Sequence, residues 1–171
     1  QFHLDPQPNE TDEAALFVAE HMSGIARRCH AEKVPFPSMY AWWVLSDVFD
    51  ESSYRIEYPF IGCMGMLSLQ NIRKPVYNTF RMISMLGDTF TAMSVLPDNS
   101  KVNGLAAQDE TGIQVFIYNS SKESCNLSLS INNIKTQKKP IQYRCYLLDS
   151  DNGNSYNTWV TMGKPAIAAM S

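Results

Sequence analysis

Three carboxylates stand close together just after an apolar run. Residues 40–45 have the length and composition of a short buried strand, and Asp47, Asp50 and Glu51 follow within six residues. An ionised carboxylate accepts hydrogen bonds from two adjacent hydroxyl groups, which suits the recognition of a diol. Because the carboxyl ends of the strands of an α/β barrel carry its binding residues, these acids are candidates for sugar contacts. A solvated acidic loop is the alternative.

Two aromatic residues and one basic residue extend this group. Trp43 lies near the carboxyl end of the run, where an indole ring can stack on the apolar face of a pyranose; packing between strand and helices is the alternative. Trp42 belongs to the opposite face by the two-residue period of a strand, and we expect it to pack in the interior. Arg55, in the following loop, is a candidate ion-pair partner for the acids.

The surrounding sequence predicts the elements that position these residues. Thr11 or Asp12 is placed to cap a helix whose apolar side chains recur at helical spacing and which ends before Pro35. A long loop then follows residues 40–45. Pro75 suits the first turn of a second helix, which Gly87 closes. The order is helix, strand, long loop and helix.

The character of the chain changes after residue 88. Short apolar or alternating segments are separated by turn-rich stretches, which predicts an antiparallel sheet or sandwich; they are residues 90–95, 102–107, 113–118, 127–131 and 141–147. We therefore expect two domains, residues 1–88 and 89–171. One parallel strand with two helices cannot satisfy its own ladder of hydrogen bonds, so the first half is interpreted as a slice of an α/β domain.

Composition and charge narrow the functional classes. The 171 residues include 18% charged side chains and carry a net charge of −3, which gives no electrostatic footprint for nucleic acid or an anionic membrane. No apolar run is long enough to span a bilayer. The three histidines, His3, His21 and His30, lack metal-ligand spacing, so we expect neither a metal nor another cofactor.

Sequons and cysteines indicate the compartment. The sequons at Asn9, Asn119 and Asn126 favour the secretory route, with glycosylation of a secreted or lysosomal protein; unmodified surface asparagines are the alternative. The four cysteines permit three full pairings. Cys125 and Cys145 fall on consecutive predicted strands, so a structural disulfide between them is a candidate. The chain begins at Gln1 in polar, proline-bearing sequence, which we interpret as the start of a piece rather than of a whole protein.

Five ordered segments resemble glycoside hydrolase family 39, the family of β-xylosidases and α-L-iduronidases. The segments are residues 43–51 (Trp-Val-Leu-Ser-Asp-Val-Phe-Asp-Glu), 59–66 (Pro-Phe-Ile-Gly-Cys-Met-Gly-Met), 72–75 (Ile-Arg-Lys-Pro), 86–88 (Leu-Gly-Asp) and 149–165. The resemblance implies the last strand and helices of a (β/α)8 TIM barrel ending near residue 88, followed by an antiparallel β-sandwich domain.

The resemblance also implies a chemistry. Family members are retaining glycosidases with two glutamates, one attacking the anomeric carbon and one protonating the leaving oxygen. Neither glutamate motif is found here, because the Asn9–Glu10 pair lies in a proline-bearing loop and is interpreted as a sequon and helix-entry acid. Trp43, Asp50 and Glu51 match sugar-binding positions of the family, with Asp47 as a further candidate. In an iduronidase-like enzyme, Arg55 would bind a substrate carboxylate.

The sequence therefore predicts the C-terminal part of a retaining O-glycoside hydrolase that resembles β-xylosidase. It supplies sugar-binding residues, while the catalytic glutamates lie on an upstream barrel chain that is its expected partner. The fragment alone is expected to be inactive. The alternative is a glycosidase-like structural or glycan-binding extracellular protein without catalysis. A free-standing lectin-like sandwich is a third interpretation, which the unpaired strand disfavours.

Overall fold

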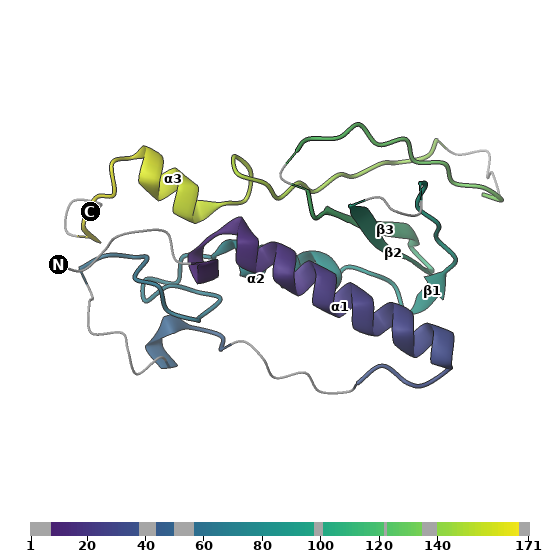
Figure 1. Cartoon of the computed structure of the whole chain (residues 1–171), viewed down its shortest axis with the longest axis horizontal. Helices are drawn as coiled ribbons and strands as arrows, with labels where there is room; N and C mark the ends of the chain where they lie inside the picture. The colour runs from purple at the N-terminus through teal and green to yellow at the C-terminus, as the bar shows by residue number, and fades with distance from the viewer. Residues whose placement is uncertain are drawn as a thin grey trace.

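The fold combines three α-helices with one small antiparallel sheet in the part of the chain that is described (Figure 1). The computed structural model describes residues 8–37, 44–49, 57–97, 101–121, 123–134 and 140–167. The elements, in chain order, are η1 (Pro8–Glu10), α1 (Asp12–Glu32), η2 (Asp47–Phe49), α2 (Pro75–Ile83), β1 (Thr89–Thr91), β2 (Val102–Asp109), β3 (Gly112–Asn119) and α3 (Ser155–Thr161).

Helix α1 forms where the sequence predicts it. Thr11 adopts an extended backbone, and its side chain accepts a hydrogen bond from the Glu13 N–H, so Thr11 is the N-cap. The helix ends at Lys33 with φ of 56°, where a left-handed residue lets backbone N–H groups reach the last carbonyls.

Helix α2 packs beside α1 and together they build one apolar core. Pro75 occupies the first turn of α2, as expected from the sequence. Val76 of α2 is fully buried against a stripe of α1. The buried members of this core are Ala14, Val18, Met22 and Val76, with Met66, Phe80 and Ile83 packed at its edge.

The strands form one sheet in the order β1-β2-β3, antiparallel throughout. Leu105 pairs with Phe116, and the two strands meet at a tight turn. In that turn Asp109 Oδ1 accepts hydrogen bonds from the Thr111 hydroxyl at 2.6 Å and from the backbone N–H groups of Thr111 and Gly112 at 2.7 and 3.1 Å, and these bonds, that of the hydroxyl above all, lower the pKa of Asp109.

Arg27 joins α1 to this sheet. Its guanidinium donates to Asn103 Oδ1 at 2.8 Å and to the Gly104 carbonyl at 3.2 Å, and it also reaches the Tyr118 hydroxyl at 3.4 Å. Glu20 of α1 accepts a hydrogen bond from the hydroxyl of Ser120, just after β3. The helix from the first half of the chain is thus bonded to the sheet of the second half. The division at residue 88 stays a prediction.

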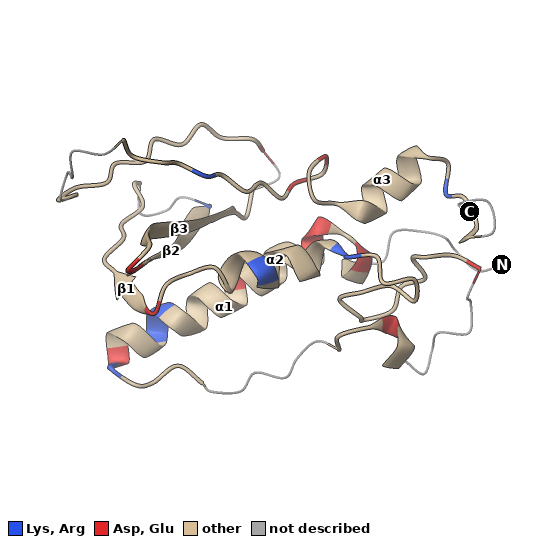
Figure 2. Ribbon diagram, turned by 180° about the vertical axis from the view of Figure 1, so that it is seen from behind, with Lys and Arg blue, Asp and Glu red and all other residues tan. Residues whose placement is uncertain are grey.

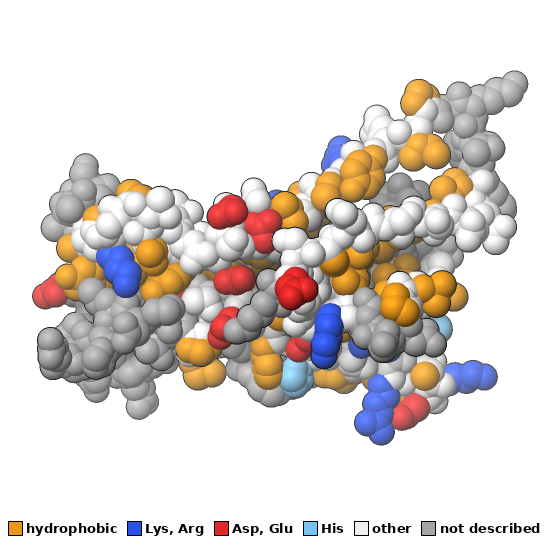
Figure 3. Space-filling model, turned by 45° about the horizontal axis from the view of Figure 1, so that its top comes forward, with side chains coloured by type: hydrophobic (Ala, Val, Ile, Leu, Met, Phe, Trp, Pro, Cys, Tyr) orange, Lys and Arg blue, Asp and Glu red, His pale blue; other side chains and the backbone are white. Residues whose placement is uncertain are grey.

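Two strand predictions are wrong in the structure. Residues 127–131 and 141–147 lie in extended segments that run alongside each other but belong to no strand (Figure 1). Most of their large apolar side chains are exposed, and Figure 3 shows hydrophobic side chains along this arm. Alternation of apolar residues predicts a strand only when a partner completes the ladder and covers one face, and the described residues supply neither. They contain one sheet, which is compatible with a family fragment rather than a whole barrel and sandwich.

Helix α3 is absent from the sequence-based interpretation, which treats residues 149–165 as an acidic turn and an aromatic stretch. Asn154 caps the helix by accepting a hydrogen bond from the Asn157 N–H at 3.1 Å. The Asn154 side chain also donates to Asp12 Oδ1 at 3.3 Å, across 142 residues of sequence. Asparagine and threonine favour helices weakly, so the packing of Tyr156 and Trp159, three residues apart on one face, decides the conformation.

A buried lysine as the candidate functional site

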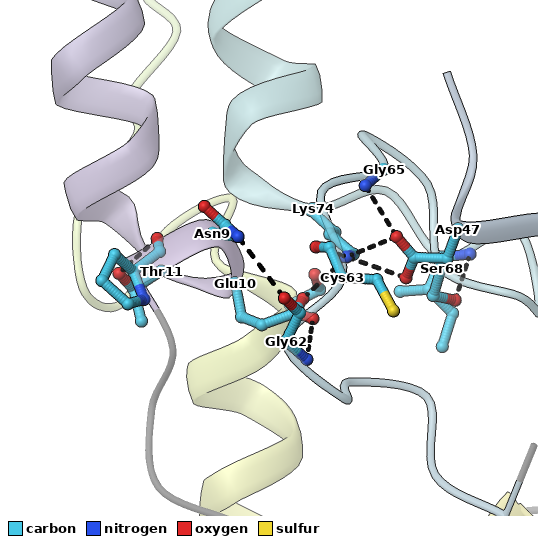
Figure 4. A network of polar contacts seen from close by, with 12 residues as sticks. Asn9, Glu10, Thr11, Asp47, Gly62, Cys63, Gly65, Ser68 and Lys74 are labelled. Carbon is cyan, nitrogen blue, oxygen red and sulfur yellow. Dashed lines mark hydrogen bonds and ion pairs between the residues drawn. The ribbon is translucent and has the colours of Figure 1, made fainter. Parts of the chain in front are cut away.

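Lys74 is the centre of a buried polar network (Figure 4). Its side chain has 0% exposure, and Nζ lies 2.8 Å from Asp47 Oδ2 and 3.0 Å from Glu10 Oε2. Nζ also donates to Asp47 Oδ1 and to the Cys63 carbonyl, both at 2.9 Å. An ammonium group has three N–H donors, and here two of them form hydrogen bonds to Asp47 and Cys63, while Glu10 faces the same group as an ion pair.

Local structure brings these groups together from three parts of the chain. Glu10 ends the short helix η1 before α1, and Asp47 begins η2. Ser46, the residue before Asp47, forms a parallel bridge with Leu67, and Leu67 in turn bridges to Arg73 beside Lys74. These short ladders align the three segments, so that the side chains of Glu10, Asp47 and Lys74 converge in the interior.

Backbone N–H groups hold the carboxylates from the other side. The Gly62 N–H donates to Glu10 Oε1 at 2.8 Å, and the Gly65 N–H donates to Asp47 Oδ1 at 2.7 Å. A methyl group on Gly65 would overlap the backbone and side chain of Asp47. Each carboxylate is therefore held both by the ammonium group and by a neighbouring peptide.

Among the described residues, two acids of this network face one lysine. Burial is the main influence on Glu10 and raises the pKa of its carboxyl, because a buried carboxylate loses its hydration. The charge and hydrogen bond of Lys74 and the Gly62 N–H lower that pKa, but they do not offset the burial. Lys74 supplies the positive charge facing both Glu10 Oε2 and Asp47 Oδ2.

This geometry excludes some chemistry for the described residues. A nucleophilic lysine needs a neutral amine open to substrate, whereas Lys74 is enclosed and paired with two acids. No group of three histidine, cysteine, aspartate or glutamate side chains lies together as a metal site within the described ranges. What the network can do is fix the relative positions of residues 8–10, 44–49 and 62–65.

An aromatic cluster lies beside the network and holds the last helix. Phe60, which follows the fully buried Pro59, contacts Tyr156 and Trp159 with ring centroids 5.6 and 5.4 Å apart. Tyr58 meets Trp159 edge to face at 6.2 Å. The indole N–H of Trp159 donates to the Pro165 carbonyl at 2.9 Å, which satisfies its one polar group in the interior.

Among the predicted sugar-binding residues, the structure describes Asp47, which is fully buried with its carboxylate held by Lys74 and Gly65. Trp43, Asp50, Glu51 and Arg55 lie outside the described residues, and their roles stay predictions. The parts played by Glu10 and Lys74 were not predicted from the sequence. One signal was available, because a lysine immediately before the first turn of a helix opposes the helix dipole and must be compensated elsewhere.

The sequon asparagines and the cysteines take separate places. The Asn9 amide donates to the Gly62 carbonyl at 3.4 Å, the Asn119 amide donates to the Glu123 carbonyl at 2.8 Å, and Asn126 is exposed. The predicted disulfide is not formed, because Cys125 and Cys145 are both free thiols. Their residues lie in the extended segments rather than on paired strands, so no ladder sets the two sulfur atoms opposite each other.

Comparison with known proteins shows the family to which the sequence belongs. The sequence model of the glycosyl hydrolases family 39 matches residues 11–170, which is nearly the whole chain. This chain belongs to glycosyl hydrolase family 39. A β-xylosidase of Caldicellulosiruptor saccharolyticus is 26% identical over 132 residues; the match covers 74% of this chain and 26% of that enzyme. The chain thus spans about a quarter of the length of this curated relative.

Most of the sequence segments that resemble the family lie together in the structure. Four of the five segments that carry the resemblance meet in the structure, through Asp47, Cys63 and Lys74 in the network and through Phe60 and Trp159 in the aromatic cluster.

Charged residues of both signs are interspersed over the ribbon (Figure 2). No helix within the described ranges combines the length and apolar character needed to cross a membrane.

Proposed function

We propose that this chain is the C-terminal, sugar-binding part of a retaining O-glycoside hydrolase that resembles β-xylosidase. Asp50 and Glu51 bind hydroxyl groups of the sugar, Trp43 stacks on its ring, and Asp47 supports the segment from which the two acids follow. Both catalytic glutamates lie on upstream chain of a TIM barrel, to which residues 1–88 contribute the last strand. Residues 89–171 belong to a β-sandwich.

The observation that carries this proposal is the anchoring of Asp47. The residue lies three positions before Asp50, the first of the acidic pair, and Lys74, the Gly65 N–H and the Ser46–Leu67 bridge hold it in place. A binding site gains affinity when its residues are held before the ligand arrives, because less conformational freedom is lost on binding. Family membership and the β-xylosidase relative supply the class of ligand.

The test uses the full-length gene product and aryl glycosides. We expect hydrolysis of an aryl β-xyloside with retention of anomeric configuration. Proton NMR of the first-formed sugar measures that configuration. Asp50→Ala and Glu51→Ala should each lower kcat/KM by at least about tenfold, since each removes charge-assisted hydrogen bonds to the sugar. Lys101→Ala, at an exposed position, is the control and should leave kcat/KM unchanged. Absence of hydrolysis with every aryl glycoside, together with binding of xylo-oligosaccharides, would instead favour the glycan-binding alternative.

The upstream partner is tested on the purified protein. Intact mass and N-terminal sequencing under denaturing conditions, with and without reductant, should reveal a longer polypeptide or a copurifying one that carries the upstream barrel and its two catalytic glutamates. A folded monomer made of residues 1–171 alone would contradict the assignment to a barrel.

We also propose a secreted or lysosomal location. Asn126 is exposed in an extended segment, where a glycan meets no steric obstacle from regular structure. After expression in a eukaryotic secretory host, treatment with an N-glycosidase should reduce the mass of the protein. Asn126→Gln should remove one increment of that shift, and an unchanged mass would contradict the proposal.

A further inference from the structure

We propose that Lys74 is a positioning residue for sugar binding, which acts by setting the distance between residues 44–49 and residues 57–67. The inference rests on the proposed function for its effect on substrate, but the structural half stands on contacts alone. Among the described residues, the one candidate sugar-binding position that Lys74 contacts is Asp47. Its role is therefore exerted through the segments that it joins.

The contacts of Lys74 are distributed over both segments. Nζ bonds Asp47 in one segment at 2.8 Å and the Cys63 carbonyl in the other at 2.9 Å. The backbone adds to this, since the Lys74 N–H donates to the Met66 carbonyl at 3.0 Å. A single residue thus bonds both segments, and Glu10 fixes the same ammonium to the residues before α1 at 3.0 Å.

The hydrogen bonds to the carboxylates of Glu10 and Asp47 fix direction as well as distance. Replacing a buried ion pair by apolar side chains of equal volume is often neutral or favourable for stability, so stability alone does not require a charged group at this place. Hydrogen bonds are directional, however, and Asp47 Oδ1 accepts one from the Gly65 N–H and another from Lys74 Nζ, while Glu10 Oε1 accepts one from the Gly62 N–H. Donors from two segments at one carboxylate fix its orientation as well as its distance from Lys74.

The junction between the two segments, where Gly65 meets Asp47, is tightly packed. Gly65 approaches Asp47 so closely that no side chain fits between the two segments. Residues 50–56, which contain Asp50, Glu51 and Arg55, lie between these segments along the chain. The separation of the two segments therefore sets the positions of the two ends of the stretch that contains every predicted sugar-binding residue after Asp47.

The test compares Lys74→Met with Val76→Ala in the full-length protein. Val76 is fully buried in the first turn of α2, two residues after Lys74, and its truncation removes apolar packing without touching the network. For Lys74→Met we expect KM for the aryl xyloside to rise by about tenfold or more with kcat within about threefold, because ground-state and transition-state contacts are lost together. Val76→Ala should lower the melting temperature but leave KM unchanged.

Hydrogen exchange measures the positioning without any substrate. In Lys74→Met, the amides of residues 44–49 and 62–67 should exchange at least about tenfold faster than in Val76→Ala, at a temperature where both variants are folded. The exchange rates of the amides of β2 and β3 should be the same in the two variants. If Lys74→Met does not fold, Asp47→Asn takes its place, because asparagine keeps an oxygen for the Gly65 N–H but loses the charge attraction to Lys74.

The outcomes separate the two proposals. An active protein in which Lys74→Met changes neither KM nor exchange beyond the Val76→Ala control overturns the positioning role and leaves the proposed function intact. An inactive protein that binds no sugar overturns the proposed function, and the exchange experiment alone then decides whether Lys74 sets the separation of the two segments.

Discussion

Lys74 Nζ lies 2.8 Å from Asp47 Oδ2, with both side chains fully buried and the two residues 27 positions apart in the sequence. The contact joins the start of helix α2 to the segment that precedes the predicted sugar-binding acids. Because removal of one partner leaves the other charged and desolvated, the pair is far more costly to break than to replace as a whole.

Lys74→Met should therefore lower the free energy of unfolding by about 3–5 kcal/mol, since the buried carboxylates of Glu10 and Asp47 lose their counter-charge. Equilibrium urea unfolding measures the change. Lys101→Met, at an exposed position, is the matched control and should stay within about 0.5 kcal/mol of the wild type. A loss below about 1 kcal/mol for Lys74→Met would mean that the network contributes little to stability.

Glu10 gives the unfolding free energy a characteristic dependence on pH. Its pKa is raised by burial above the ordinary value of 4.5, so between the two values the folded state binds more protons than the unfolded state. The contribution of Glu10 is fully present below pH 4.5 and is lost as the pH rises through the raised pKa. Glu10→Gln should remove this contribution, so the stability of the wild type relative to the variant should fall as pH increases above 4.5. A difference that is constant with pH, or that grows with pH, would contradict the shift.

Trp159 should be the main anchor of helix α3. Trp159→Ala removes a buried ring that contacts Tyr58, Phe60 and Tyr156, and we expect a loss of about 3–5 kcal/mol in the free energy of unfolding. Val160→Ala, next to it on the exposed side of the helix, should change that energy by less than about 0.5 kcal/mol. Urea unfolding followed by circular dichroism distinguishes the two, and similar losses in both variants would exclude a special role for Trp159.

Two glycines should respond in opposite ways to alanine. A methyl group at Gly24, in the middle of α1, meets no atom within 4 Å, so Gly24→Ala should stabilise the protein by about 0.5–1 kcal/mol through helix propensity. At Gly65 the methyl group overlaps Asp47, so Gly65→Ala should destabilise the protein by about 1–3 kcal/mol through overpacking. Thermal unfolding of both variants provides the comparison, and a stabilised Gly65→Ala would show that the junction is looser than described.

Local signals account for the elements that the sequence predicted well. Thr11 and the apolar periodicity define α1, Pro75 defines the start of α2, and the alternating segments around a tight turn define β2 and β3. Each depends on a few neighbouring residues and on one buried face. Family membership, inferred from five ordered segments, is confirmed by the match over residues 11–170.

The remainder depended on contacts that are distant in sequence. Helix α3 is held by rings from residues 58–60, and the Lys74 network joins residues 10, 47 and 74; neither leaves a periodic pattern. The extended segments show the opposite case, in which residues 127–131 carry the alternation of a strand but have no partner among the described residues. Pattern alone identifies a face that can be buried, not what buries it.

The hydrogen bond from Asn154 to Asp12 has a consequence for synthesis on the ribosome. It connects the cap of α3 to the first turn of α1 across 142 residues, so the beginning of α1 leaves the exit tunnel long before its partner is translated. Contacts between distant parts of a chain are slow to form, because a long loop must close first. The first turn of α1 therefore lacks this bond until residue 154 has left the exit tunnel, and a chaperone can bind the nascent chain during that interval.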